Sequence, residues 1–104
     1  LPTSANQEDH VSMATYGARR LADMAKNTAV VVGVEAMAAV QGMDFDRRLK
    51  SSPLIEAQYA LIRSQVPYLA QDRYLAPDIE TMRLWALETD WPEAVQRILP
   101  SAAL

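Results

Sequence analysis

The chain has 104 residues, enough for one domain, and half of them are apolar while 7% are aromatic, which favours packed helices over a sheet. A formal net charge of -3 argues against nucleic-acid binding, which needs clustered positive charge. With no cysteine and a single histidine, the sequence lacks thiol chemistry and the residues of an ordinary zinc site.

The first predicted helix runs from about Asp9 to Gln41, because strong helix formers dominate this stretch and no proline interrupts it. Ser4 and Asn6 precede it and offer N-terminal capping oxygens. A helix of this length spans about 50 Å. We therefore expect a rod that packs against other chains or against a missing part of its own protein. Its small and apolar residues form one stripe at helical spacing: Val11, Ala14, Ala18, Leu21, Ala25, Thr28, Val32, Ala36 and Ala39.

Residues 29–40 are apolar on nearly every side of this helix, with Glu35 as the one charged residue. A membrane span needs about 20 such residues. The stretch therefore predicts a helix buried in a large core or in a subunit interface, not a membrane anchor. Glu35 fits a paired or partly exposed structural acid better than a functional carboxylate.

Gly42 is predicted to end the long helix, because glycine commonly follows a C-terminal cap. Residues 43–52 then form a polar connection, with Phe45 as its expected anchor. Pro53 opens the second helix and Pro67 closes it. The expected buried face of this helix comprises Leu54, Ala57, Leu61 and Ile62.

Pro77 opens a third predicted helix. Its expected apolar side comprises Ile79, Met82, Leu84, Trp85 and Leu87. Asp90-Trp91-Pro92-Glu93 has the pattern of a capping box and begins a last helix through about Leu99. The predicted fold class is therefore all-α, with one very long helix followed by three shorter helices.

Polar chemistry is concentrated in Asn6-Gln7-Glu8-Asp9-His10, at the start of the long helix. Acid, amide and imidazole groups at a helix N-terminus often serve only as caps and first-turn charges. The sequence shows no nucleophile–base arrangement and no glycine-rich phosphate loop. Periodicity and composition alone therefore indicate an all-helical domain that binds a partner.

The segment from Thr3 to Met13, TSANQEDHVSM, closely resembles a signature in the C-terminal half of histidine ammonia-lyases, which are aromatic amino acid ammonia-lyases. The resemblance implies that residues 1–104 are a C-terminal helical segment of such an enzyme. In this family, the segment contributes long helices to a homotetramer whose active sites are assembled from several subunits. The similarity continues, in the family's order, in QGMDF (41–45), LKSSPL (49–54) and DRYLAPDIE (72–80).

The resemblance also implies a reaction, the elimination of ammonia from L-histidine to give urocanate, in a cytoplasmic enzyme of histidine degradation that uses no metal. The family's electrophile is methylidene-imidazolone (MIO), made from an internal Ala-Ser-Gly. This sequence contains no Ala-Ser-Gly, and it begins without a methionine. We therefore expect the remainder of the same polypeptide to supply the electrophile, and we expect the chain alone to be inactive.

Glu8 corresponds directly to a residue of the family's site. It matches the position that faces the substrate's imidazole in histidine-specific members, where relatives acting on phenylalanine or tyrosine typically carry an amide. A carboxylate accepts an imidazole N–H or stabilises an imidazolium, and such a charge pair is worth up to about 4 kcal/mol before desolvation reduces it. Glu8 is thus the predicted catalytic and substrate-binding residue. Gln7 is a second candidate for substrate contact, while Asp9 and His10 fit capping equally well.

Two other interpretations stay open. A phenylalanine or tyrosine ammonia-lyase, or an aminomutase, would carry a similar signature. Glu8 counts against such a substrate, because a buried carboxylate gains nothing beside a neutral phenyl ring. A helical interaction module without chemistry is the other possibility, and it would fold alone as a single species.

Overall fold

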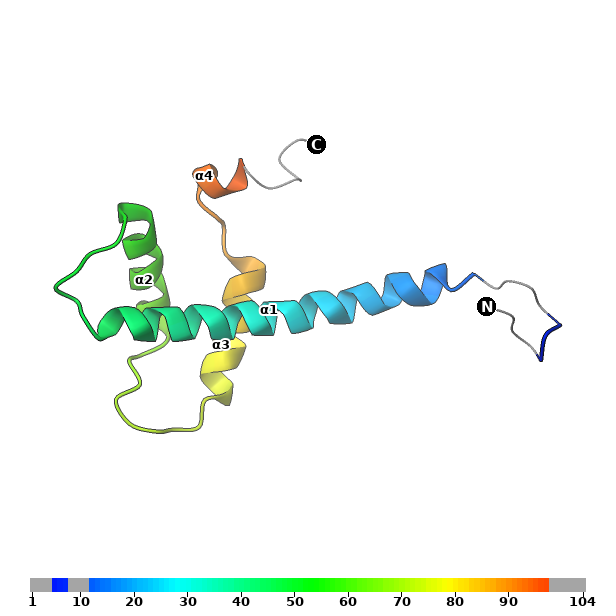
Figure 1. Ribbon diagram of the computed structural model, residues 1–104, viewed down its shortest axis with the longest axis horizontal. Helices are drawn as coiled ribbons and strands as arrows, with labels where there is room; N and C mark the ends of the chain where they lie inside the picture. Colours follow the sequence, from blue (N-terminus) through cyan, green and yellow to red (C-terminus); the bar gives the residue numbers. More distant parts are fainter. Residues whose placement is uncertain (1–4, 8–11, 98–104) are drawn as a thin grey trace.

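The computed structural model of the chain describes residues 5–7 and 12–97. Within these residues it contains four helices and no strand: α1 (Ala14–Asp44), α2 (Pro53–Gln65), α3 (Ala76–Glu88) and α4 (Glu93–Gln96). The predicted all-helical class is confirmed for this part of the chain. Figure 1 shows α1 as the long axis of the molecule, with α2 and α3 lying across its C-terminal half.

The first helix starts later than predicted. Its N-cap is Met13, whose side chain makes no capping hydrogen bond, while Ser12 Oγ accepts a bond of 3.4 Å from the Ala14 N–H. Asn6, an expected cap, instead lies in a separate turn with a φ of 69°. That left-handed conformation is incompatible with the start of a right-handed helix. α1 therefore begins more than one turn beyond the predicted start near Asp9.

The first helix also continues past Gly42, which was predicted to end it. No described glycine has the positive φ that makes glycine favourable after a helix. The helix runs on to Asp44, and the Phe45 N–H donates a hydrogen bond of 3.3 Å to the Gly42 carbonyl. Phe45 itself is 76% exposed. The prediction that Phe45 anchors the following connection is therefore wrong within this chain.

The boundaries of α2 agree with the prediction. Ser52 Oγ accepts a hydrogen bond of 3.4 Å from the Ile55 N–H, and Pro53 occupies the first turn. The predicted buried face is wrong except at Ile62, which is 3% exposed. The other three residues of that face, Leu54, Ala57 and Leu61, are exposed. They are exposed because α2 contacts α1 far less than α3 does.

Pro77 lies in the first turn of α3, as predicted. Of the expected apolar side, Met82 is fully buried and Trp85 is 8% exposed, whereas Leu84 and Leu87 are exposed. The side chains that reach the core are thus those that face α1.

The last helix is shorter than predicted, since α4 ends at Gln96. Leu99, its expected end, lies outside the described residues. Trp91, which precedes α4, packs edge-to-face against Trp85 with the ring centroids 5.2 Å apart. This aromatic pair ties the segment after α3 back to the core.

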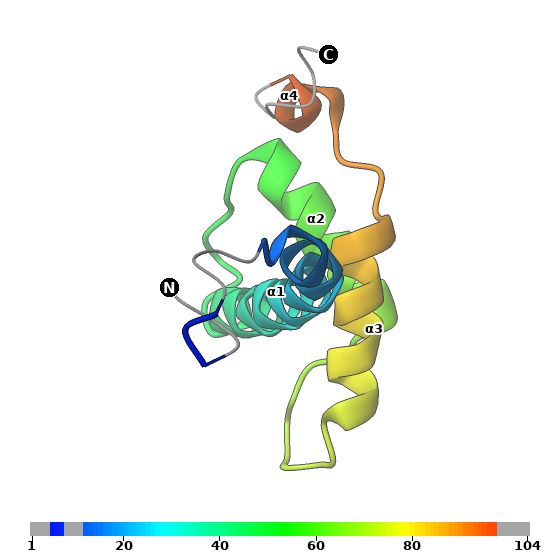
Figure 2. The ribbon, with the colours of Figure 1, turned by 90° about the vertical axis from the view of Figure 1, so that its right-hand side faces the viewer.

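A small core joins the first three helices. α3 crosses α1 at Gly33, where an added Cβ atom would lie 2.9 Å from the carbonyl carbon of Met82. The missing side chain at Gly33 therefore permits the two backbones to approach closely. Figure 2, turned by 90°, shows α3 against one side of α1 and α2 beside it. The buried core cluster comprises Val40, Ile62, Val66, Met82 and Trp85.

The N-terminal half of α1 extends beyond this core (Figure 1). Residues 12–28 are all exposed, and the first buried residue of the helix is Ala29. The radius of gyration is 19.9 Å, against about 13 Å for a compact domain of this size. Among the described residues, no other helix therefore covers the predicted small-residue stripe of α1 on the N-terminal side of Ala29. None of the described helices combines the length and apolar composition that crossing a membrane requires.

Candidate functional site

The residues singled out by the sequence lie at the N-terminal end, and the structure describes only part of them. Gln7 is exposed, in a turn formed by residues 5–7. The roles predicted for Gln7 and Glu8 therefore stay predictions, since Glu8 lies outside the described residues. Four residues of this region lie outside the described residues: Ser4, Glu8, Asp9 and His10.

The turn that precedes Glu8 in sequence has an unusual backbone. Ala5 has a φ of 54° and Asn6 a φ of 69°, both in the left-handed region. Asparagine tolerates this region, whereas for alanine it costs about 1–2 kcal/mol. Strained backbone of this kind clusters at functional sites, where the surrounding structure holds it in place. The strain lies directly before the position at which the signature places the substrate contact.

A polar cluster that the sequence did not predict joins α1 to α2. Asp44, the last residue of α1, accepts a hydrogen bond from the Tyr59 hydroxyl and one of 2.8 Å from Arg63 Nε. Arg63 Nη2 also lies 2.7 Å from Asp44 Oδ2, and the two side chains are only 14% and 13% exposed. These bonds from α2 hold Asp44 in place, which explains why α1 continues beyond Gly42.

Gln41 extends the cluster to the connection between α2 and α3, residues 66–75. Its Oε1 accepts hydrogen bonds of 3.1 Å from the Leu69 N–H and from Arg63 Nη2. Its Nε2 donates a bond of 3.2 Å to the Leu69 carbonyl. One side chain therefore binds both backbone groups of a residue far along the chain.

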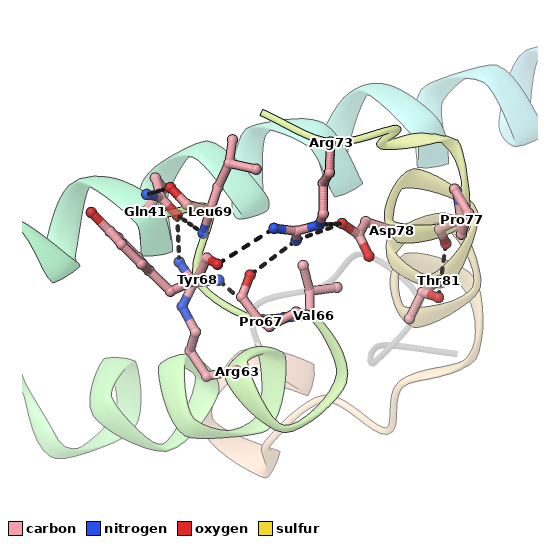
Figure 3. A network of polar contacts seen from close by, with 10 residues as sticks. All are labelled: Gln41, Arg63, Val66, Pro67, Tyr68, Leu69, Arg73, Pro77, Asp78 and Thr81. Carbon is pink, nitrogen blue, oxygen red and sulfur yellow. Dashed lines mark hydrogen bonds and ion pairs between the residues drawn. The ribbon is translucent and has the colours of Figure 1, made fainter. Parts of the chain in front are cut away.

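Arg73 secures the far end of the same connection. Its guanidinium donates to the backbone carbonyls of Pro67 at 3.2 Å and Tyr68 at 3.4 Å, and it pairs with Asp78 of α3 at 2.7 Å. Figure 3 shows these bonds together with those of Gln41. A connection without helical structure is thus fixed by side chains at both of its ends.

A second ion pair ties the bend after α1 to α2. Arg47 Nη2 lies 2.5 Å from Glu56 Oε2, and the same guanidinium lies 4.0 Å from the centroid of the Tyr59 ring. Glu56 also accepts a bond of 2.9 Å from the Ser51 N–H. The hydrogen bonds from Arg47 and Ser51 hold the pKa of Glu56 below its usual range.

Acidification should weaken the cluster around Asp44. Burial raises the pKa of Asp44, but the hydrogen bonds from Tyr59 and Arg63 and the positive charge of Arg63 together lower it below its ordinary 3.8. A carboxyl with a lowered pKa stabilises the fold above its unfolded pKa, and this stabilisation is lost as the pH falls through the folded pKa. We expect the free energy of unfolding to decrease as the pH falls below about 4. The decrease should be smaller in Asp44→Asn. Urea unfolding at neutral and acidic pH measures this, and identical pH profiles of the two proteins would contradict it.

The described cluster suits a structural role better than catalysis. Its carboxylates are paired with arginines inside the fold. Among the described residues, no group of three histidine, cysteine, aspartate or glutamate side chains could hold a metal ion. Tyr74 is 82% exposed, Glu80 pairs with Arg83 at 2.6 Å, and Glu35 is exposed on α1.

Comparison with known proteins identifies the family. Residues 1–64 match the profile of the family described as aromatic amino acid lyase. Over 101 residues, 97% of its length, the chain is 74% identical to a protein named histidine ammonia-lyase from Paracidovorax citrulli. It is 52% identical over 102 residues, also 97% of its length, to a histidine ammonia-lyase of Desulfotalea psychrophila. The chain belongs to the aromatic amino acid lyase family, as its signature indicated.

A third relative, a histidine ammonia-lyase of Vibrio cholerae, is 61% identical over 80 residues, which are 77% of this chain and 16% of that protein. The chain covers 20% of the Paracidovorax protein and 20% of the Desulfotalea protein. It therefore spans about one fifth of the length of the relatives that it matches most fully.

Proposed function

We propose that the chain is the C-terminal helical segment of a histidine ammonia-lyase, which eliminates ammonia from L-histidine to give urocanate. The observation that carries this proposal is the 74% identity, over 97% of the chain, to a protein of that name. Relatives of the same name from two other organisms support it at 61% and 52% identity.

In this proposal Glu8 selects the substrate. Its carboxylate accepts an N–H of the substrate's imidazole or stabilises the imidazolium form, and Gln7 is a neighbouring amide with access to the same ligand. A phenyl ring offers neither a hydrogen bond nor a charge in return for desolvating the carboxylate. Glu8 therefore favours histidine over phenylalanine or tyrosine as the substrate.

Replacement of Glu8 in the intact enzyme tests this role. Glu8→Gln keeps the size of the side chain but removes its charge. We expect kcat/KM for L-histidine to fall about 100-fold, equivalent to about 2.7 kcal/mol of transition-state stabilisation. The rate of urocanate formation, followed by its ultraviolet absorbance, measures the effect.

Glu93→Gln is the matched control, because it makes the same chemical change at a glutamate side chain that is 78% exposed. We expect it to leave kcat/KM within about twofold. Near-normal turnover of histidine by Glu8→Gln, with Glu93→Gln unchanged as well, would remove the role assigned to Glu8.

The residues of this chain do not fit the source of the family's electrophile. Methylidene-imidazolone needs an internal Ala-Ser-Gly, and the residues before Gly17, Gly33 and Gly42 are tyrosine, valine and glutamine. The proposal therefore places the electrophile in another part of the polypeptide, with this chain inactive alone. The exposed N-terminal half of α1 supports a place for this helix in the core of a homotetramer. The location proposed for the intact enzyme is the cytoplasm.

A further inference from the structure

The turn of residues 5–7 has a backbone conformation found nowhere else in the described chain. Figure 1 shows this turn, in dark blue, beyond the N-terminal end of α1. Ala5 (φ 54°) and Asn6 (φ 69°) are the only described non-glycine residues with positive φ. Two consecutive positive φ values are typical of a type I′ turn, whose central positions are mostly glycine, asparagine or aspartate. Asn6 suits this conformation, whereas it is unfavourable for Ala5.

The turn has no packing role in the part of the chain that the structure describes. All three of its residues are exposed, and α1 begins only at Ala14. The first buried residue of that helix is Ala29. A conformation that is unfavourable for alanine and contributes nothing to the core is typical of a functional constraint on the backbone.

Glu8 follows this turn closely in the sequence. It lies outside the described residues, but covalent geometry limits its distance from Asn6, because two residues span at most about 7 Å. A catalytic group must be held to within about 0.5 Å, and a displacement of about 1 Å can lower a rate about 100-fold. A change of φ at Asn6 redirects the chain immediately before Glu8. The conformation of the turn therefore bears directly on where the Glu8 carboxylate can lie.

We propose that Ala5 and Asn6 are positioning residues, whose left-handed backbone directs the Glu8 carboxylate toward the imidazole of the substrate. The inference rests on the proposed function, in which Glu8 contacts this ring. Ala5 and Asn6 act through the backbone, and their side chains make no contact with the substrate. The effect of a substitution therefore follows the ability of the new residue to adopt positive φ, and its polarity is unimportant.

Substitutions of Asn6 in the intact protein test this rule. Valine is branched at Cβ and rarely adopts positive φ, whereas glycine adopts it readily. We expect Asn6→Val to lower kcat/KM for L-histidine at least about tenfold, and Asn6→Gly to keep it within about threefold of the parent value. The rate of urocanate formation measures both. An equal loss in the two variants would show that the amide side chain itself is needed, and would overturn the proposal.

Ala5 gives a second comparison of the same kind. Ala5→Gly removes the Cβ atom that disfavours positive φ and should keep kcat/KM within about threefold, whereas Ala5→Val should lower it at least about tenfold. Ala70→Val is the matched control, because Ala70 is also exposed and outside the helices but has no positive φ. We expect this control to stay within about threefold of the parent. A loss as large as that of Ala5→Val would contradict the role of the turn.

A double-mutant cycle separates positioning of Glu8 from general damage to the protein. Because Asn6 acts through Glu8, Asn6→Val should have little further effect once the carboxylate is removed. We expect Glu8→Gln and the double variant with Asn6→Val to have kcat/KM values within about threefold of each other. Losses that multiply would show that Asn6 acts independently of Glu8 and would overturn the proposal.

Melting temperatures of the intact variants test for a merely structural role. We expect those of Asn6→Val and Asn6→Gly to agree with the parent within about 2 °C, because the turn is exposed. A loss of kcat/KM that follows the melting temperature, and not the preference for positive φ, would assign the turn to stability and overturn the proposal.

The unmodified intact protein distinguishes this inference from the proposed function on which it rests. Failure to form urocanate from L-histidine would refute the proposed function, and the inference with it. An active intact protein in which Asn6→Val and Asn6→Gly retain the full kcat/KM would refute the inference alone and leave the proposed function standing.

Discussion

Gly33→Val should destabilise the chain by about 3 kcal/mol, since it forces side-chain atoms into a crossing that has no room for them. A Cβ atom at Gly33 would lie 2.9 Å from both the carbonyl carbon and the carbonyl oxygen of Met82. These are backbone atoms, so α3 must move away as a whole, and Met82 and Trp85 lose their packing against α1. Urea unfolding measures the loss. Tryptophan fluorescence reports the separation, because Trp85 belongs to the same core cluster as Met82 and Trp91 packs against that cluster.

The same substitution at Gly17 is the control. A Cβ atom there meets nothing within 4 Å, and valine has a slightly better helix propensity than glycine. We expect Gly17→Val to change the free energy of unfolding by no more than about 0.5 kcal/mol. A loss of similar size at the two positions would show that the α1–α3 crossing is not where the structure places it.

Arg63→Met should cost about 3 kcal/mol, because it removes one partner of an ion pair whose side chains are 14% and 13% exposed. Methionine keeps much of the aliphatic length, so the packing of the stem is preserved. Asp44 then keeps its hydrogen bond from Tyr59 but loses its counter-charge. The backbone carbonyl of Val66, which accepts a bond of 3.0 Å from Arg63 Nη1, loses that donor as well. Urea unfolding of the chain measures the effect.

Arg48→Met is the matched control near the same end of α1. Arg48 pairs with Asp46 at 2.8 Å, but its side chain is 89% exposed, and exposed pairs of this kind contribute little. We expect this variant to unfold at nearly the same urea concentration as the parent chain. Equal losses in the two variants would show that the cluster around Asp44 has no special part in joining α1 to α2.

Local signals were sufficient to predict the second and third helices. Ser52-Pro53 encodes a cap and a first turn for α2, and Pro77 encodes the first turn of α3, which has no side-chain cap. No distant contact is needed to place these two helix starts. Gly42 misled the prediction because its usual effect is local, whereas the end of α1 depends on Asp44 and its distant partner Arg63.

Burial was harder to predict than helix position. Gly33 gave no local signal of its role, because that role depends on where α3 crosses α1. Leu54 and Leu61 have the spacing of a buried face but are exposed, since a helical pattern does not say which partner covers it. The predicted site came from the Gln7-Glu8 signature, and periodicity had no part in it. The hydrogen bonds between the Gln41 side chain and the Leu69 backbone could not be predicted, because the two residues are far apart in the sequence.

The most direct test of whether the Glu8 carboxylate recognises a ring that can carry charge is to compare kcat/KM of the intact protein for different substrates. We expect kcat/KM for L-histidine to exceed that for L-phenylalanine and L-tyrosine by at least about 1,000-fold, because a site built for a hydrogen bond strongly rejects an analogue without one. Comparable or faster formation of the unsaturated acid from phenylalanine or tyrosine would contradict the assignment.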